Sequence, residues 1–246
     1  MIANLIQQGY FQQVTNEGKP TWILQHPVQV VVKADVLKEL QRIYPLHEET
    51  GGILYAFPAA NKSLIVTRFT VLANQLTGEP RKTGYKPLNS AGEIVNALQL
   101  GALPIRFHSH PVEIYENPYD KQPLTFFQKT SSADRHNAYN PLLIENYRVV
   151  LPDGLLSADD RAGKDVRFYL YGGLIAPDSL KALFTSEKLY IYFSVAAVLI
   201  ALLFGSLKKA WRIFLIAGVA SIAVFLLEKR PTGVKNSEGD LIITIY

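Results

Sequence analysis

The chain contains no cysteine among its 246 residues, and this absence removes several classes of protein at once. Folds stapled by disulfides, thiolate zinc fingers, cysteine nucleophiles and deaminases whose zinc ligands include cysteine are all excluded. Any metal ion bound by the chain must therefore take nitrogen and oxygen ligands. Charged residues make up 19% of the chain and hydrophobic residues 48%, a composition that excludes a wholly disordered protein.

Most of the chain carries no excess of positive charge. Residues 1–187 contain 18 Lys and Arg against 18 Asp and Glu, so the net charge of +4 arises entirely within residues 188–246. There the basic residues flank two uncharged hydrophobic segments, a position typical of membrane boundaries. Because the membrane boundary accounts for the excess charge, we expect no nucleic-acid partner.

Two hydrophobic segments predict a membrane anchor at residues 188–230. Residues 189–207 form a run of 19 uncharged residues, and residues 213–227 form a second run of 15. As a helix, the first run spans about 28 Å, close to the roughly 30 Å core of a bilayer. We expect a multi-pass hairpin of two helices in the lipid bilayer; the alternative is a pair of buried core helices.

The orientation of this anchor depends on opposing signals. Residues 1–12 lack the basic and hydrophobic regions of a signal peptide, so we expect the large domain before the anchor to be cytoplasmic. By the positive-inside rule, the basic turn at residues 208–212 favours the opposite orientation. The basic residues that follow the second segment favour a cytoplasmic position of the large domain.

The rest of the chain predicts one α/β domain at residues 28–187, with an N-terminal extension of unclear role at 1–27 and a C-terminal tail at 231–246. Alternating and β-branched patterns predict strands, and apolar residues at helical spacing predict helices. The expected strands are 28–32, 52–57, 63–73, 103–110, 147–151 and 166–171, and the expected helices are 34–44 and 90–101.

Three local signals accompany these elements. Ser90 and Glu93 have the spacing of a capping box at the start of the second helix. Residues 152–154, Pro-Asp-Gly, are typical of a turn between two strands. Residues 241–246 have a strand-like pattern, for which the sequence offers no obvious partner.

A pair of histidines lies at the end of the strand expected at 103–110. Because side chains alternate along a strand, His108 and His110 leave the same face, with Cα atoms about 6.7 Å apart, close enough to bind one metal ion. Asp134 could supply a third ligand and leave a fourth position to water, the arrangement of catalytic zinc. The alternative for this last segment is a helix N-cap, because Ser131 and Asp134 also have that spacing.

Glu49 adds a carboxylate in the turn before the strand expected at 52–57. If that strand lies beside the histidine strand, this carboxylate could take a proton from metal-activated water. The alternative for a single Glu in a turn is a solvated surface side chain.

These residues occur in an order that resembles the JAMM/MPN+ (JAB-domain) metallopeptidase family, the zinc-dependent isopeptidases that cleave ubiquitin and ubiquitin-like proteins from their targets. The matching segments are Glu49-x-Gly-Gly-Ile-Leu, His108-Ser109-His110-Pro111 and Ser131-x-x-Asp134. The resemblance extends over about residues 28–173. It implies a mixed β-sheet wrapped by helices, similar to cytidine-deaminase-like folds, with one zinc ion.

Carried over by position, the resemblance assigns roles to five residues. It implies that His108, His110 and Asp134 bind zinc. It implies that Glu49 is the general base, and that Ser131 donates a hydrogen bond to the developing oxyanion. The expected function is that of a membrane-anchored zinc-dependent isopeptidase or peptidase acting on a ubiquitin-like or other protein substrate. The alternative is a catalytically inactive scaffold or binding module of the same fold, tethered to the membrane.

The sequence departs from the family pattern between the second histidine and the aspartate. His110 and Asp134 are 24 positions apart, whereas the family's gap is about ten residues. Residues 112–130 would then be an insertion, either a lid beside the metal or a surface loop. Asp120 is the alternative ligand at the shorter spacing, although no serine precedes it by three residues.

Overall fold

The computed structural model describes residues 1–25, 27–44, 48–78, 80, 84–111, 132–158, 166–172 and 233–245. The chain divides into two compact units, residues 1–175 with 231–246 and residues 176–230. All described residues belong to the first unit, and the anchor expected at 188–230 lies outside them. Across the described ranges, every helix is too short or too polar to cross a bilayer.

A mixed sheet forms the centre of the first unit. Among the described residues it has eight strands in the order β10-β9-β6-β4-β5-β3-β12-β11. Their bounds are β3 Val28–Val32, β4 Gly51–Pro58, β5 Leu64–Val71, β6 Leu103–His110, β9 Pro152–Ala158, β10 Val166–Gly172, β11 Val234–Lys235 and β12 Leu241–Ile245. Strands β3 and β5 and strands β6 and β9 pair in parallel, and the other neighbours are antiparallel. The expected α/β class with a mixed sheet is confirmed.

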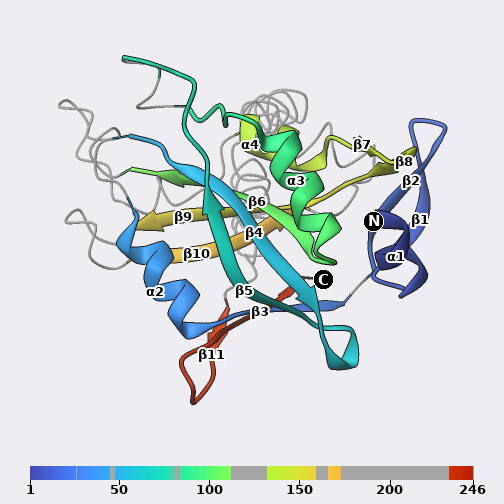
Figure 1. Ribbon diagram of the computed structural model, residues 1–246, viewed down its shortest axis with the longest axis horizontal. Helices are drawn as coiled ribbons and strands as arrows, with labels where there is room; N and C mark the ends of the chain where they lie inside the picture. The colour runs from blue at the N-terminus through green and yellow to red at the C-terminus, as the bar shows by residue number, and fades with distance from the viewer. Residues whose placement is uncertain are drawn as a thin grey trace, which may run out of the picture. The chain divides into compact units, whose positions relative to one another are not determined.

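Short helices pack against this sheet. They are α2 Ala34–Arg42, α3 Ser90–Gln99 and α4 Ser132–Tyr139. Helix α1, Ile2–Gln7, contacts strand β1, Phe11–Asn16, and a 3₁₀ turn lies at Ala60–Lys62. Helix α2 buries Val36, Leu37 and Leu40, which lie on one face because they are spaced by one, three and four residues. Helix α3 lies across β4 and β6, and α4 contacts β10 (Figure 1).

A second sheet, with four strands in the part of the chain that the structure describes, has the order β1-β2-β8-β7. Its strands are β1 Phe11–Asn16, β2 Lys19–Leu24, β7 Leu142–Ile144 and β8 Tyr147–Val149. Trp22 on β2 meets Tyr147 on β8 edge-on, with ring centroids 6.2 Å apart. Ile2 and Leu5 of α1 are buried in the common hydrophobic core. The segment expected as an N-terminal extension therefore contributes a helix and two strands to this unit.

The hydrophobic core explains why β6 presents its histidines on one face. Leu103, Ile105 and Phe107 are buried at alternate positions of β6, which leaves His108 and His110 on the opposite face. The ring of Phe107 meets Phe69 of β5 edge-on at 5.9 Å. Each such buried side chain contributes roughly 1.5–3 kcal/mol to stability, so this face fixes the register of the histidine strand.

Two local predictions are wrong. Helix α3 begins at Ser90 with Asn89 as its N-cap, in a left-handed conformation (φ 57°). The capping box does not form, because the Glu93 carboxylate accepts a hydrogen bond from the Tyr55 hydroxyl of β4 instead. The turn expected at residues 152–154 is the start of β9, which the long-range pairing with β6 holds in an extended conformation.

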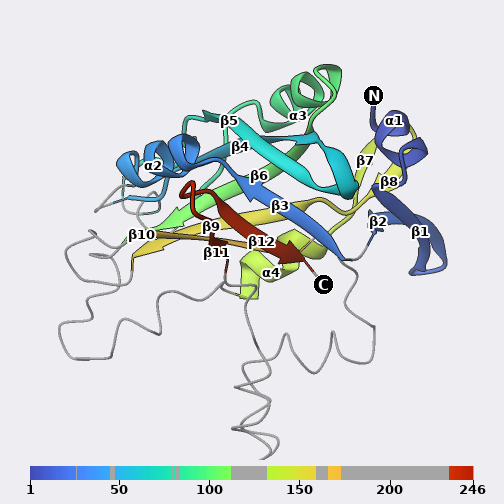
Figure 2. The same ribbon diagram turned by 90° about the horizontal axis from the view of Figure 1, so that it is seen from below.

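The C-terminal strand has a partner that local sequence did not reveal. Strand β12 pairs with β3 over five residue pairs, from Leu241 opposite Val32 to Ile245 opposite Val28 (Figure 2). Asp240 adds a polar link, because its carboxylate accepts hydrogen bonds from the Ala34 N–H at 2.9 Å and from Lys33 Nζ at 2.6 Å. Residues 241–245 are thus an integral part of the central sheet.

Candidate metal centre

Two imidazoles converge at the end of β6. The Nε2 atoms of His108 and His110 lie 3.1 Å apart, and the rings are tilted by 60°. Strand β6 is held by β4 on one side, where His108 lies opposite Gly51, and by β9 on the other, where His108 lies opposite Leu155. The pair therefore sits on a strand in the middle of the sheet, a rigid position for metal ligands.

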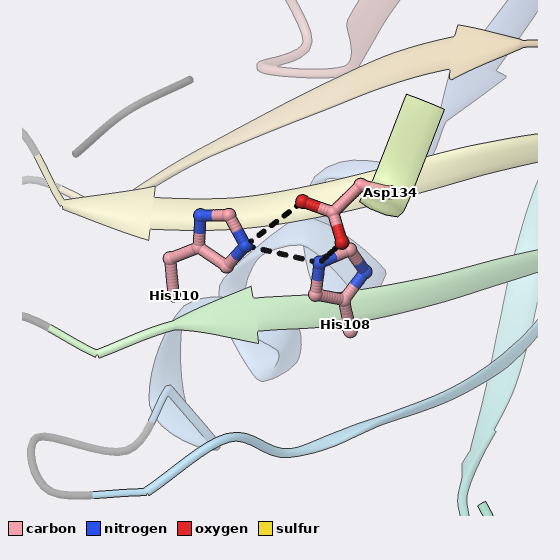
Figure 3. A group of neighbouring side chains, drawn as sticks. All are labelled: His108, His110 and Asp134. Atoms are coloured by element: carbon pink, nitrogen blue, oxygen red, sulfur yellow. Dashed lines mark hydrogen bonds and ion pairs between the residues drawn. The ribbon is translucent and has the colours of Figure 1, made fainter. Parts of the chain in front are cut away.

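Helix α4 supplies a carboxylate to the same point. Asp134 Oδ1 lies 3.3 Å from His108 Nε2, and Asp134 Oδ2 lies 3.2 Å from His110 Nε2 (Figure 3). A tetrahedral ion with bonds of about 2.0–2.1 Å requires ligand atoms about 3.3 Å apart. The structure thus brings together the three residues that the sequence singled out, in a group that could hold a metal ion.

The electrostatics of this group favour a cation. Burial by itself raises the pKa of Asp134, but hydrogen bonds from His108 and His110 lower it well below its usual range. Burial by itself lowers the pKa of His108, but the Asp134 hydrogen bond and charge raise it overall. The ionised carboxylate therefore favours positive charge beside it, charge that a divalent cation could supply in place of a proton.

A cavity of about 360 Å³ lies at this group and is lined by His108, His110 and Asp134. Glu49 borders the same cavity. Its side chain is buried, with 6% exposed, so the solvated-surface alternative is wrong. Burial raises the pKa of Glu49, against the opposing effect of the two imidazoles. A carboxylate with a raised pKa beside a metal site is suited to accepting a proton from water.

Backbone hydrogen bonds fix Glu49 relative to the histidines. The Thr50 N–H donates to Ser109 Oγ at 2.9 Å, and the Ser109 N–H donates to the Thr50 carbonyl at 2.8 Å. Ser109 lies between the two histidines and Thr50 follows Glu49, so the two segments cannot move independently. Tyr44, two residues after the end of α2, adds a third constraint, because its hydroxyl donates to the His110 carbonyl at 2.6 Å.

The two glycines after Thr50 permit this close approach. A Cβ built on Gly51 would lie 2.2 Å from the Phe107 carbonyl oxygen, and one on Gly52 would lie 1.8 Å from the Thr70 carbonyl oxygen. Both clashes are with backbone, so neither can be relieved by moving a side chain. The Glu-x-Gly-Gly segment thus has a physical reason in this fold: only glycine lets β4 lie this close to its neighbours.

Several further side chains around this centre belong to no motif in the sequence. Arg106 and Asp153 line the cavity and form an ion pair, with Arg106 Nη2 2.8 Å from Asp153 Oδ2. Tyr171 on β10 meets His108 edge-on, with ring centroids 6.5 Å apart. Arg106 shares the alternation of the histidines and could have been identified from it, whereas Asp153 was hidden by its turn-like neighbours.

Other expected site residues fall outside the part of the chain that the structure describes. They are Ser131, the alternative ligand Asp120 and the insertion at 112–130. The position of Asp134 against both imidazoles favours it as the third ligand. Asp134 also lies in the first turn of α4, so one residue can lie near the helix start and also contact the two imidazoles.

Comparisons with known proteins add little to this geometry. No family model matches the chain, and no curated protein matches it. A solution structure of a protein from Desulfitobacterium hafniense is 16% identical, covers 59% of this chain and 84% of that protein, and has a TM-score of 0.38. A solution structure from Salinibacter ruber is 17% identical, covers 60% and 82%, and has a TM-score of 0.34. Similarity this low establishes neither a shared fold nor a shared function.

Proposed function

We propose that this chain is a zinc-dependent hydrolase whose metal ligands are His108, His110 and Asp134. The observation that carries the proposal is the convergence of the three side chains beside the buried carboxylate of Glu49: the two Nε2 atoms lie 3.1 Å apart, and each lies 3.2–3.3 Å from one oxygen of the Asp134 carboxylate. Two imidazoles and one carboxylate, with a fourth position left for water, are a typical ligand set of catalytic zinc. The absence of cysteine rules out the thiolate-rich sets of structural zinc.

The reaction follows from where the protein groups lie. When bound, zinc supplies a Lewis acid that polarises a carbonyl and lowers the pKa of water to about 7. Glu49 takes the proton from the attacking water and delivers it to the departing amine nitrogen, a role that its raised pKa favours. We assign Ser131 the hydrogen bond to the developing oxyanion, by its position in the motif.

We propose a peptide or isopeptide bond as the substrate. The support is the resemblance of the three motif segments to the JAMM/MPN+ family, together with a cavity of about 360 Å³ beside the ligands. The substrate class that this resemblance implies is a ubiquitin-like protein or another protein with an accessible tail.

We also propose that residues 188–230 anchor the chain in a bilayer. Strands β10 and β11 belong to the same sheet, where β10 ends at Gly172 and β11 begins at Val234. Both ends of the intervening segment must then lie on one side of a membrane, which requires an even number of crossings. Two uncharged runs, residues 189–207 and 213–227, meet that requirement.

The test is metal-dependent cleavage by the full-length protein in detergent. The probe is a ubiquitin-like protein with a fluorophore attached at its C-terminus by an amide bond. We expect Glu49→Gln to retain zinc and lose cleavage by at least about 100-fold, because it removes the proton acceptor and leaves the ligands. The matched control is Glu48→Gln, which removes the neighbouring carboxylate and should cleave like the wild type. A wild-type protein that binds no zinc and cleaves nothing would favour the scaffold alternative.

A further inference from the structure

A row of polar side chains lies next to the metal ligands. Arg106 on β6 is opposite Asp153 on β9, and Asp153 is in turn opposite Tyr171 on β10. Arg106 precedes His108 by two residues, so both project from the same face of β6. Neither Arg106 nor Asp153 belongs to the ligand group, and the proposed hydrolysis leaves both without a role.

Arg106 connects three elements through one nitrogen. Its Nη2 donates to Asp153 Oδ2 at 2.8 Å and to the main-chain carbonyl of Asn137 at 3.1 Å. Asn137 lies in α4, three residues after Asp134, so the two residues occupy the same helical face about 4.5 Å apart along the axis. A single guanidinium therefore ties β6, which carries the histidines, to the turn of α4 that carries the third ligand.

Helix α4 contacts β10, but few of its described side chains are buried. It is eight residues long, and among its described side chains Ala138 is the only buried hydrophobic one. An alanine buries little apolar surface, so its burial contributes roughly 1 kcal/mol or less. A charge-assisted hydrogen bond from Arg106 contributes a comparable or larger amount and also has a fixed direction.

The charge on Arg106 is balanced locally. Asp153 has 6% of its surface exposed, and its carboxylate pairs with the guanidinium, so the pair adds no net charge beside a site for a cation. An isolated positive charge at this position would repel a metal ion. The balanced pair keeps the planar hydrogen-bonding geometry of arginine without that repulsion.

We propose that Arg106 is a positioning residue of the metal centre. It clamps α4 to β6 and thereby holds the Asp134 carboxylate at the distance from the two imidazoles that a tetrahedral ion requires. The inference rests on the proposed zinc site and extends it to a residue outside the ligand set. Residues outside the ligand set that orient the ligands typically change metal affinity by about 10–100-fold.

The test measures zinc affinity in the full-length protein by competition with a chromophoric chelator. Four forms are compared: wild type, Arg106→Gln, Asp153→Asn and the double variant. We expect Arg106→Gln to weaken zinc binding by about 10–100-fold. Asp153→Asn keeps the guanidinium and its bond to Asn137 but leaves the charge of Arg106 unbalanced, so we expect a loss of zinc affinity that is smaller than that of Arg106→Gln. The double variant should bind zinc as weakly as Arg106→Gln.

The double variant separates positioning from charge neutralisation. If Arg106 served only to neutralise Asp153, removing both charges would restore wild-type affinity, and that result would overturn the inference. Substitution of Co²⁺ for Zn²⁺ gives a second readout, because its visible absorption reports ligand geometry. We expect a weaker, shifted band in Arg106→Gln, whereas a loss of stability alone would leave the spectrum of the folded fraction unchanged.

Arg106→Lys covers the case in which Arg106→Gln does not fold. It keeps the charge beside Asp153 but lacks the planar fork, so we expect a folded protein with weakened zinc binding and an altered Co²⁺ spectrum. If the wild type binds zinc and Arg106→Lys shows the same zinc affinity and the same Co²⁺ spectrum, this inference is overturned while the proposed function stands. A wild type that binds no zinc would overturn the proposed function and this inference with it.

Discussion

Thr50 and Ser109 exchange two hydrogen bonds, one at 2.9 Å to the serine hydroxyl and one at 2.8 Å to the threonine carbonyl. This exchange joins the segment that carries Glu49 to the strand that carries both histidines. It also explains why the residue between the two histidines is a buried serine, with 0% of its surface exposed, and not a hydrophobic residue.

Ser109→Ala should lower both stability and turnover. It leaves the Thr50 N–H without its acceptor, at a cost of about 1–3 kcal/mol in the free energy of unfolding. Glu49 should lose its fixed position, so kcat should fall while the zinc content stays at the wild-type level. Ser63→Ala is the matched control, because its hydroxyl makes an exposed bond to the Ala60 carbonyl. Equal losses of stability in the two variants, measured by urea unfolding, would contradict this account.

Gly52→Ala should be among the most damaging small substitutions in the chain. Its Cβ would lie 1.8 Å from the Thr70 carbonyl oxygen, so β4 and β5 would have to separate. We expect a loss of about 4 kcal/mol or more in the free energy of unfolding, or failure to fold. Gly84→Ala is the comparison, since its closest contact is the end of the Leu76 side chain at 3.1 Å. Similar melting temperatures for the two variants would show that β4 tolerates a Cβ.

Strand β6 and the burial of its hydrophobic face were predictable, because the period-two alternation of a half-buried strand is a local signal. The convergence of His108 and His110 follows from that alternation alone. Asp134 could be identified only from the order of the motifs, since it lies 24 positions after His110. The roles of these residues in catalysis, and that of Ser131, remain predictions.

Long-range pairing accounts for what sequence patterns did not reveal. Asp153 sits in a Pro-Asp-Gly segment typical of turns, and only pairing with β6 makes it a buried strand residue. Strand β12 finds its partner β3 more than two hundred positions earlier in the chain, a distance that no local pattern encodes. The capping box failed because Tyr55, from another element, competes for Glu93. In each case a tertiary contact overrides a local preference.

Asp240 should make stability depend on acidic pH. Hydrogen bonds from Lys33 and the Ala34 N–H lower the pKa of Asp240 in the folded state below its ordinary value of 3.8. Because the pKa is lower in the folded state, the ionised Asp240 stabilises the fold fully above pH 3.8. This stabilisation is lost as the pH falls from 3.8 through the pKa of the folded state. Asp240→Asn should therefore be less stable than the wild type at neutral pH, and the difference should vanish in strong acid.

Glu238→Gln is the control for that pH dependence. Glu238 Oε2 lies 3.7 Å from Lys33 Nζ, with 73% of its side chain exposed, so its removal should leave the stability profile unchanged. The measurement is the melting temperature of each variant from pH 2 to pH 7. A constant difference between Asp240→Asn and the wild type across this range would contradict the role assigned to the ionised carboxylate.

Metal removal should destabilise the folded protein. A ligand that binds only the folded state stabilises it by about 2.7 kcal/mol at a hundred times its dissociation constant. We expect a chelator to lower the melting temperature of the wild type and added zinc to restore it. His108→Ala should show no response to either addition. A chelator effect of equal size in His108→Ala would indicate that zinc binds elsewhere.

Anomalous diffraction at the zinc absorption edge tests the central claim most directly. Crystals of the zinc-loaded full-length protein should show a single strong peak about 2.0–2.2 Å from His108 Nε2, His110 Nε2 and one oxygen of Asp134. That peak should be absent from crystals of Asp134→Ala grown under the same conditions. No peak between the two imidazoles of the wild type, or a peak that does not contact Asp134, would contradict the account.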